Sequence, residues 1–203
     1  MNSFEQELLK LIGKEKLRKV QSYTIGIGGT GGLGSNCAFN LVRAGFKKFV
    51  IADFDKIEYS NLNRQFYFYD QVGMAKVEAL KENLLKINPD IEVEVYEKKL
   101  TEANIEKIFD SCQIIVEAFD NVSSKKMIVN TYLNTEKLLV SASGLSGWGN
   151  SDQIKIRKMN KTSYIVGDMQ TEASKKTPPI SPKVNITAAK EADIILNYVM
   201  EEG

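Results

Sequence analysis

Short apolar runs alternate with amphipathic segments along most of this chain. The runs are rich in Ile, Val and Phe, and most are bounded by Gly, Asn or Asp, which is typical of buried strands. The predicted strands are residues 23–28, 47–53, 91–99, 113–119 and 137–143. The predicted helices between them are residues 33–44, 73–87, 101–110 and 122–134. This alternation predicts an α/β fold of Rossmann-like type with a doubly wound, mainly parallel sheet.

The pattern changes at both ends of the chain. Ser3 and Gln6 have the spacing of a capping box, which predicts a helical lead-in over residues 1–20. After Gly144, two polar-alternating strands follow each other with no helix between them, and they predict an antiparallel C-terminal extension of the sheet. The last predicted segments are strands 151–159 and 162–168, a mobile Pro-, Ser- and Lys-rich loop 170–183, and a helix 187–200. We expect residues 1–203 to form a single domain.

The composition limits the chemistry. The 203 residues include no histidine and two cysteines, which excludes Ser-His-Asp and Cys-His catalysis, histidine metal ligands and a four-cysteine zinc site. Lys plus Arg (27) nearly balance Asp plus Glu (26), so we expect neither a nucleic-acid nor a membrane partner. Few cysteines are typical of a reducing compartment, and no apolar run reaches the roughly 18 residues of a spanning helix. We therefore expect a cytoplasmic protein.

A glycine cluster follows the first predicted strand and precedes a helix. Two registers of Gly-x-Gly-x-x-Gly fit it: Gly26, Gly28 and Gly31, or Gly29, Gly31 and Gly34. We favour the second, because it leaves a complete strand before the turn. Such a turn directs backbone N–H groups and the positive end of a helix at an anion, typically a nucleotide phosphate. A P-loop is excluded, because its lysine would have to stand at Ser35.

Asp53 ends the second predicted strand. A carboxylate at this position commonly accepts hydrogen bonds from ribose hydroxyls, and it would serve NAD and ATP equally well. Asp55 is the weaker candidate, because we expect only one member of the pair to face the nucleotide.

The long connection 54–72 contains the segment SNLNRQ at residues 60–65. A dinucleotide fold has little use for an arginine-bearing loop here, whereas a triphosphate needs planar donors such as Arg64. Lys76 falls in the first turn of the next predicted helix, where a positive charge is unfavourable unless an anion lies beside it. We expect Arg64 and Lys76 to bind phosphate; surface ion pairs are the alternative for both.

Asp120 and Asn121 follow the predicted strand 113–119. The carboxyl ends of parallel strands form the ligand-binding edge of open α/β sheets, so Asp120 is placed to bind Mg²⁺ together with phosphate oxygens. Alternatively, Asp120 or Asn121 caps the following helix while the other coordinates. Cys37 and Cys112 fall in or beside apolar segments, and we expect both to be inert core thiols.

Taken together, these segments resemble one known family. GGTGGLGSN, ADFDKIEYSNLNRQFY, GMAKVEAL and EAFDN occur in the order and spacing of the ThiF-like superfamily of sulfur-carrier adenylyltransferases, related to ubiquitin-activating enzymes, over residues 14–170. The chain is most similar to short ThiF-like proteins of thiamine biosynthesis. The resemblance implies that the C-terminal glycine of a small ubiquitin-like sulfur carrier, ending in Gly-Gly, attacks ATP to give an acyl-adenylate and pyrophosphate.

The resemblance also implies roles for the matching residues. The implied nucleotide-binding residues are Gly29, Gly31, Gly32, Gly34, Asp53, Asn61, Arg64, Lys76 and Asn121. The implied catalytic residues are Arg64, Lys76 and Asp120. Gly32 would lie against the phosphates, Asp53 would hold the ribose, and Asn61 with the two basic side chains would contact the triphosphate. Asp120 would bind Mg²⁺ and Asn121 would assist at the nucleotide.

The sequence departs from the family pattern in two respects. Many relatives carry paired C-x-x-C motifs for zinc, or a cysteine that forms a thioester or persulfide with the carrier, and this sequence carries neither. We therefore expect no zinc and adenylation alone. The N-terminal arginine motif that reaches a partner subunit's ATP is also missing, so a homodimer is an alternative rather than an expectation. Two other functions stay open: an NAD-dependent oxidoreductase of Rossmann type, and a non-catalytic module that binds a carrier.

Overall fold

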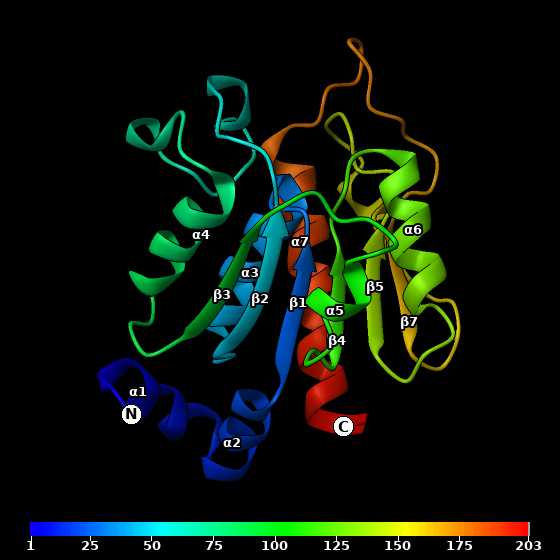
Figure 1. Ribbon diagram of the computed structural model, residues 1–203. Helices are drawn as coiled ribbons and strands as arrows, with labels where there is room; N and C mark the ends of the chain where they lie inside the picture. Colours follow the sequence, from blue (N-terminus) through cyan, green and yellow to red (C-terminus); the bar gives the residue numbers. More distant parts are fainter. Residues whose placement is uncertain (203) are drawn as a thin grey trace.

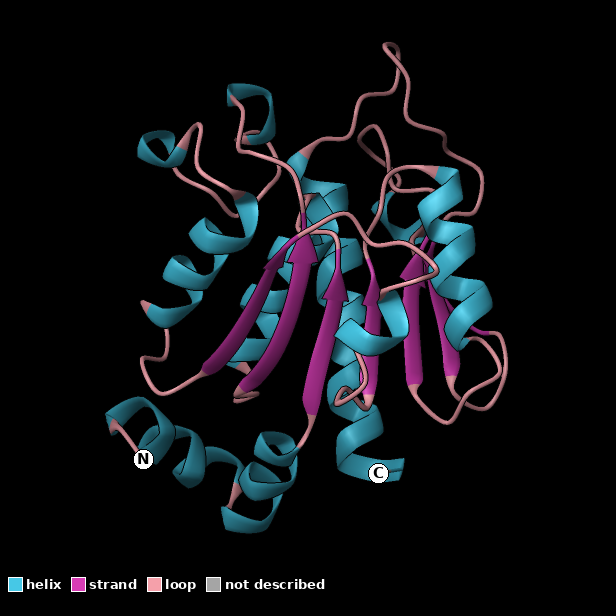
Figure 2. Cartoon of the chain, viewed as in Figure 1, coloured by secondary structure: helices cyan, strands magenta, loops and turns pink. Residues whose placement is uncertain are grey.

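The sheet forms the centre of the molecule. The computed structural model describes residues 1–202, which form one seven-stranded sheet in the order β3-β2-β1-β4-β5-β7-β6, with helices on both faces (Figures 1 and 2). This confirms the predicted Rossmann-like α/β class with a mainly parallel sheet. Gly203, the last residue of the expected domain, lies outside the described residues.

The strands follow the apolar runs of the sequence. They are β1 (Thr24–Gly28), β2 (Lys48–Asp53), β3 (Glu92–Glu97), β4 (Ile114–Glu117), β5 (Leu138–Ala142), β6 (Lys155–Lys158) and β7 (Ser163–Gly167). β4 and β5 are buried throughout, as expected for parallel strands with helices on both faces. The C-terminal extension is antiparallel only in part, because β6 pairs antiparallel with β7 whereas β7 itself pairs in parallel with β5.

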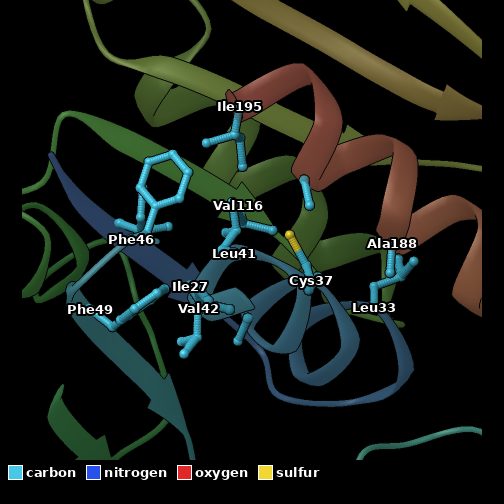
Figure 3. Packing of buried hydrophobic residues seen from close by; sticks show 14 of the residues in the cluster. Ile27, Leu33, Cys37, Leu41, Val42, Phe46, Phe49, Val116, Ala188 and Ile195 are labelled. Carbon is cyan, nitrogen blue, oxygen red and sulfur yellow. The ribbon is translucent and has the colours of Figure 1, made fainter. Parts of the chain in front are cut away.

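Two helical layers cover the sheet. One face carries α3 (Gly32–Arg43), α4 (Lys76–Leu85) and α7 (Ser181–Asn197), and the other carries α5 (Ile105–Ile108) and α6 (Val122–Tyr132). In Figure 3 the Cys37 sulfur of α3 points toward α7, on which Ala188 and Ile195 lie in the same apolar cluster. α7 therefore packs along α3 and brings its first turn to the start of that helix.

The N-terminal lead-in consists of two helices. α1 (Ser3–Ile12) is capped by Asn2, whose side chain accepts a hydrogen bond from the Glu5 N–H (2.9 Å). The predicted cap at Ser3 was therefore wrong by one residue, since Asn2 offers an equally good acceptor one position earlier. α2 (Lys14–Ser22) follows directly after Gly13.

The last helix begins earlier than predicted. α7 starts at Ser181 rather than near residue 187, so the expected loop 170–183 ends at Ile180. Pro182 lies in the first turn, where its missing N–H costs nothing because first-turn N–H groups have no acceptor within the helix. A proline that indicated a loop thus belongs to the start of a helix.

Two other helices are shorter than predicted. α4 begins at Lys76 because Gly73 has a φ of 92°, outside the helical region. The expected helix 101–110 contracts to α5 because Asn104, with a φ of −125°, is not helical. None of the helices formed by residues 1–202 has the length and apolar content that crossing a bilayer requires.

The loops that follow the parallel strands gather at one edge of the sheet. The glycine turn after β1, the connection 54–75 after β2 and the loop after β4 all leave the carboxyl ends of their strands (Figure 1). The strand order reverses between β1 and β4, and in open α/β sheets ligands bind in the crevice at such a reversal. α1 and α2 lie at the opposite edge.

Glu191 is a core carboxyl group without a hydrogen-bond partner. It lies on α7, is 0% exposed, and neither of its oxygens meets a donor among residues 1–202. Burial raises the pKa of Glu191 well above its ordinary value; Glu117 adds to the rise and Lys125 opposes it. Burial, with a smaller contribution from Glu191, also raises the pKa of the Cys37 thiol. Glu191 is therefore neutral in the folded protein at a pH where it is ionised in the unfolded chain.

We predict that Glu191→Gln stabilises the protein at neutral pH but not in acid. Below the ordinary pKa of glutamate, both the folded and the unfolded wild type bind this proton. At higher pH the unfolded chain releases it, so wild-type stability falls relative to the variant by about 1.4 kcal/mol per pH unit until the raised folded pKa is reached. Urea unfolding between about pH 4 and 8 measures the difference, with the exposed Glu82→Gln as control. A difference that does not change with pH contradicts the prediction.

Candidate functional site

The turn between β1 and α3 follows the second glycine register. Gly29 leaves the strand with a φ of 91°, and Gly31 is the N-cap residue of α3. Gly26, which the first register requires, lies within β1, where a Cβ would stand 2.9 Å from the Phe109 ring. No side chain that the structure describes caps α3. Its first backbone N–H groups are therefore left for water or an anionic ligand.

The space around the glycines separates their roles. A Cβ at Gly34 would stand 2.0 Å from the Gly29 carbonyl oxygen, and one at Gly32 would stand 2.8 Å from Val184 of α7. A Cβ at Gly31 would meet a single described atom within 4 Å, the Nε2 of Gln65 at 3.7 Å. Gly34 and Gly32 thus pack against protein, whereas Gly31 is where the turn is open to a ligand.

Asp53, the last residue of β2, holds the glycine turn. Its Oδ2 accepts hydrogen bonds from the Thr30 N–H (2.6 Å) and hydroxyl (2.8 Å), and its Oδ1 accepts from the Asp55 N–H (2.9 Å). The Tyr67 hydroxyl donates to the Thr30 carbonyl (2.8 Å), and burial raises the pKa of this hydroxyl. Asp53 is predicted from the sequence to bind a ribose. In the structure it fixes the glycine turn, which uses three of the roughly four acceptor positions of its carboxylate.

Side chains of α3 join the connection 54–75 to the glycine turn. The buried Ser35 hydroxyl accepts from the Phe66 N–H (3.0 Å) and donates to the Gly31 carbonyl (2.6 Å). One residue further, the Asn36 amide donates to the carbonyls of Gly32 (2.7 Å) and Arg64 (2.8 Å). The arginine-bearing segment is therefore held directly over the start of α3.

Arg64 is the cation of that segment. Its guanidinium donates to the Ser60 carbonyl (3.0 Å) and to Asn63 (2.8 Å), and the Cγ and Cδ of its stem lie 3.6 and 3.8 Å from the place a Cβ would occupy on Gly32. Burial lowers the pKa of Arg64, and the negative charge of Asp120 opposes this shift. The structure thus brings Arg64 and Asp120, far apart in the sequence, to the same part of the edge.

Asn61 and Lys76 both have protein partners. The Asn61 Oδ1 accepts from the Glu58 N–H (3.1 Å) and so closes the short 3₁₀ turn Tyr59–Asn61. Lys76, the first residue of α4 and only 6% exposed, places its ammonium 2.9 Å from Asp55 Oδ2. The anion that the sequence analysis required beside Lys76 is thus supplied by Asp55. Asp55 was considered only as a nucleotide ligand; it lies beyond the end of β2 at Asp53, and its pairing with Lys76 was not predicted.

Asn121 caps α6 and leaves Asp120 exposed. The Asn121 Oδ1 accepts from the Ser124 N–H (2.8 Å) and the Ser123 hydroxyl (2.9 Å). Asp120 follows β4 by three residues, and no residue that the structure describes hydrogen-bonds its carboxylate. Of the two roles left open by the sequence, Asn121 takes the cap, and the Asp120 carboxylate is available for a ligand.

The sequence analysis missed one supporting ion pair. Glu117, buried at the end of β4, lies 3.0 Å from the Lys125 ammonium, which also donates to the Ala142 carbonyl (3.0 Å). The Glu117 Oε1 accepts from the Phe119 N–H (2.9 Å), and burial raises the Glu117 pKa against the pull of Lys125. This pair fixes the start of the loop that bears Asp120. The sequence signal for this ion pair was a glutamate inside the apolar run QIIVEAF, because a buried carboxylate needs a partner.

The donor set suits a metal ion that binds mainly through its ligand. No group of three or more Asp, Glu, Cys or His side chains clusters within residues 1–202. Asp120 offers an exposed carboxylate that no described residue hydrogen-bonds, which fits Mg²⁺, an ion that takes one or two carboxylates together with phosphate oxygens and water.

Comparison with known proteins decides the family. A model of the ThiF family matches residues 4–194. This chain belongs to the ThiF family. Ubiquitin-like modifier-activating enzyme 5 of Caenorhabditis briggsae is 31% identical over 155 residues, which cover 71% of this chain and 36% of that protein. The tRNA threonylcarbamoyladenosine dehydratase of Bacillus subtilis (strain 168) is 30% identical over 153 residues, 74% of this chain and 60% of that protein.

A solved structure agrees with the ThiF family fold. The crystal structure of Escherichia coli tRNA N6-threonylcarbamoyladenosine dehydratase in complex with AMP superposes with a TM-score of 0.86, covering 96% of this chain and 93% of that one at 21% identity. The chain spans 36% and 60% of the lengths of the two sequence relatives.

Substitutions at two glycines of the ThiF family turn should separate ligand space from packing. Gly31→Ala should cost about 1 to 2 kcal/mol of unfolding free energy, because the space is open but alanine suits the N-cap position, with its ψ of −149°, less well than glycine. It should still weaken Mg-ATP binding about tenfold or more, because the methyl group occupies the approach to the backbone. Gly34→Ala should destabilise by about 3 kcal/mol or more. Urea unfolding and calorimetric titration measure both; wild-type affinity in Gly31→Ala would sink the assignment.

Proposed function

We propose that this protein uses ATP to adenylate the C-terminal glycine of a small ubiquitin-like sulfur carrier. The proposal rests on the hydrogen bonds of Ser35 and Asn36, which join the glycine turn to the Arg64 segment. It places an uncapped helix start and a guanidinium at one edge, with Asp120 beside them. A ubiquitin-like modifier-activating enzyme among the relatives supports a small ubiquitin-like protein as substrate, and the dehydratase in complex with AMP supports an adenine nucleotide as ligand.

The triphosphate would lie along the start of α3. Its oxygens would accept from the N–H groups of Gly31 and Gly32 and from Arg64, since an uncapped helix start favours anions. The Lys76 ammonium has three N–H donors and gives one to Asp55, so it can bind phosphate without leaving that partner.

The other polar residues would fix the nucleoside end and the loop. Asp53 keeps an acceptor position for a ribose hydroxyl beyond the three bonds it already accepts. Asn61 uses its oxygen on the Glu58 N–H and donates one amino hydrogen to the Ser60 hydroxyl (3.5 Å), so its second amino hydrogen would serve the phosphates. Asn121 would act through the cap of α6, which sets the position of Asp120.

Asp120 is the proposed Mg²⁺ ligand. Its carboxylate is exposed at the edge and does not cap α6. When bound, Mg²⁺ would neutralise phosphate charge and make the α-phosphorus more electrophilic.

The proposed reaction needs no histidine. A glycine carboxylate is already ionised at neutral pH, so its oxygen can attack the α-phosphorus directly. A carboxyl oxygen–phosphorus bond forms while the bond from the α-phosphorus to the bridging oxygen breaks, and pyrophosphate leaves with that oxygen. Arg64 and Lys76 stabilise the charge on the phosphates as it develops. These residues orient and neutralise, and none transfers a proton.

A cavity beside the start of α7 suits the carrier's tail. It has a volume of about 250 Å³ and is lined by Trp148, Lys176 and Lys183 among others. The Trp148 side chain is 69% exposed. Val184, the residue after Lys183, contacts the Gly32 position, so the cavity adjoins the proposed phosphate site. We propose that the Gly-Gly tail enters here, beneath the loop 170–180.

The two cysteines limit the chemistry to adenylation. Burial raises the pKa of Cys112 to about 12 and that of Cys37 well above its ordinary value, so both thiols stay protonated. They lie in different apolar clusters and do not meet to share a zinc ion. In the proposal, sulfur transfer to the activated carrier is the work of another protein.

A second candidate substrate is a carboxylate carried by RNA. The Bacillus subtilis relative is named for a modified tRNA nucleoside. Lys155 and Arg157 are exposed on one face of β6 at the edge of the sheet and give it a local positive charge, although the net charge is only +1. On the sequence resemblance we propose thiamine biosynthesis as the pathway; which substrate is adenylated decides it.

We expect ATP–pyrophosphate exchange that depends on Mg²⁺ and on a carrier protein ending in Gly-Gly. Mass spectrometry should show the adenylate on that carrier, and a carrier lacking its last glycine is the control. Exchange driven by tRNA instead of any carrier supports the second candidate. Preference for NAD over Mg-ATP in a binding titration supports the oxidoreductase alternative, and carrier binding without pyrophosphate release supports a non-catalytic module.

Arg64→Ala and Asp120→Ala should each slow adenylation at least 100-fold. Removing one group that stabilises the transition-state charge typically costs about 3 kcal/mol or more. Asp70→Ala removes an exposed carboxylate from the same connection between β2 and α4 and should leave the rate unchanged. Single-turnover rates with saturating Mg-ATP measure all three; rates near wild type for Arg64→Ala and Asp120→Ala refute the assigned roles.

A further inference from the structure

Gln65 is a buried amide without a hydrogen bond. The residue is 9% exposed, its Oε1 is fully enclosed, and its side chain bonds to no residue that the structure describes. Gln71, a second buried glutamine of the same connection, is fully engaged: its Nε2 donates to Asn83 (2.8 Å) and its Oε1 accepts from the Phe68 N–H (3.1 Å). Buried polar groups are nearly always paired, so the unpaired Gln65 amide needs an explanation.

The Gln65 amide is aimed at the open point of the glycine turn. Its Nε2 stands 3.7 Å from the place a Cβ would occupy on Gly31, where no other described atom lies within 4 Å. The backbone of Gln65 is fixed, because its N–H donates to the Asn61 carbonyl (3.0 Å) and its carbonyl accepts from the Tyr67 N–H (2.8 Å). The loop backbone therefore sets the position of this side chain, and the polar atoms of the side chain have no hydrogen-bond partner among the described residues.

The space between Gly31 and Gln65 is bounded by donors. The N-terminus of α3 lies on one side without a side-chain cap, and the Gln65 amino group lies on the other. A group placed there accepts from both sides and is best an anionic oxygen. Rotating the amide by half a turn would place its oxygen beside such an anion, and the two would repel each other. An anion therefore favours the orientation with Nε2 toward Gly31.

We propose that Gln65 binds a phosphate oxygen of the nucleotide seated over Gly31. The inference rests on the proposed nucleotide site and adds a residue to it. Without a ligand, the Gln65 Nε2 donates to no residue that the structure describes, whereas a phosphate oxygen over Gly31 would accept from it. Gln65 therefore contributes to binding at the expense of stability, as functional polar groups often do. A residue kept for the fold alone would show the opposite balance.

Gln65→Met and Gln65→Glu test the proposal through the dependence of binding on phosphate. Calorimetric titration with Mg-ATP should show an affinity about tenfold lower for Gln65→Met, as expected for a lost hydrogen bond to a charged group, and lower still for Gln65→Glu. Binding of adenosine, the phosphate-free probe, should change less than about twofold. The urea midpoint of Gln65→Met without nucleotide should equal or exceed that of the wild type. Gln6→Glu, on α1 at the opposite edge, controls for added charge.

The outcomes separate the two levels of the proposal. Mg-ATP affinity equal to wild type in both variants overturns the role of Gln65 while leaving the nucleotide site intact. An equal loss for adenosine, or a lower urea midpoint for Gln65→Met, shows that the residue shapes the pocket and also overturns it. A wild-type protein that binds no Mg-ATP overturns the proposed function itself, and with it this inference.

Discussion

The hydroxyl of Ser35 connects the parts on which the site depends. It accepts the Phe66 N–H and donates to the Gly31 carbonyl, one turn earlier on the same helix. Phe66 lies 31 residues after Ser35, and a loop segment that is partly buried needs acceptors for its backbone N–H groups, one of which α3 supplies here. That bond helps to fix the arginine-bearing segment relative to the turn. Asn36 repeats the arrangement one residue on, with Arg64 itself.

The fold followed from the sequence because its signals are local. Apolar runs bounded by turn residues mark β1, β2, β4 and β5, and helical spacing marks α3 and α6. Helix ends were less accessible, since caps compete within a residue or two of each other, as Asn2 and Ser3 do. The start of α7 was missed for a different reason. Pro182 is compatible with a loop and with a first helical turn, and only packing against α3 decides between them.

The residues of the candidate site could be predicted from the sequence, but the pairs that they form could not. Sequence placed Asp53, Arg64, Lys76 and Asp120 at one edge, because strand order fixes where loops meet. The sequence did not show that Asp55 forms an ion pair with the Lys76 ammonium or that Asn121 caps α6. Those choices depend on distances between segments remote in sequence. No separate role was predicted for Gln65, because an unpaired amide has no signature in the sequence.

Net charge alone does not make this edge attractive to a polyanion. Among the proposed site residues, three are carboxylates, Asp53, Asp55 and Asp120, and two are cations, Arg64 and Lys76. Both cations already interact with carbonyls or carboxylates of the protein. Neutral donors that are not yet engaged add to the attraction for phosphate, because they need no new partner. The uncapped start of α3 at Gly31 and the Nε2 of Gln65 are such donors. A divalent cation at Asp120 would supply the remaining positive charge, so the acidic and neutral residues belong to one electrostatic arrangement.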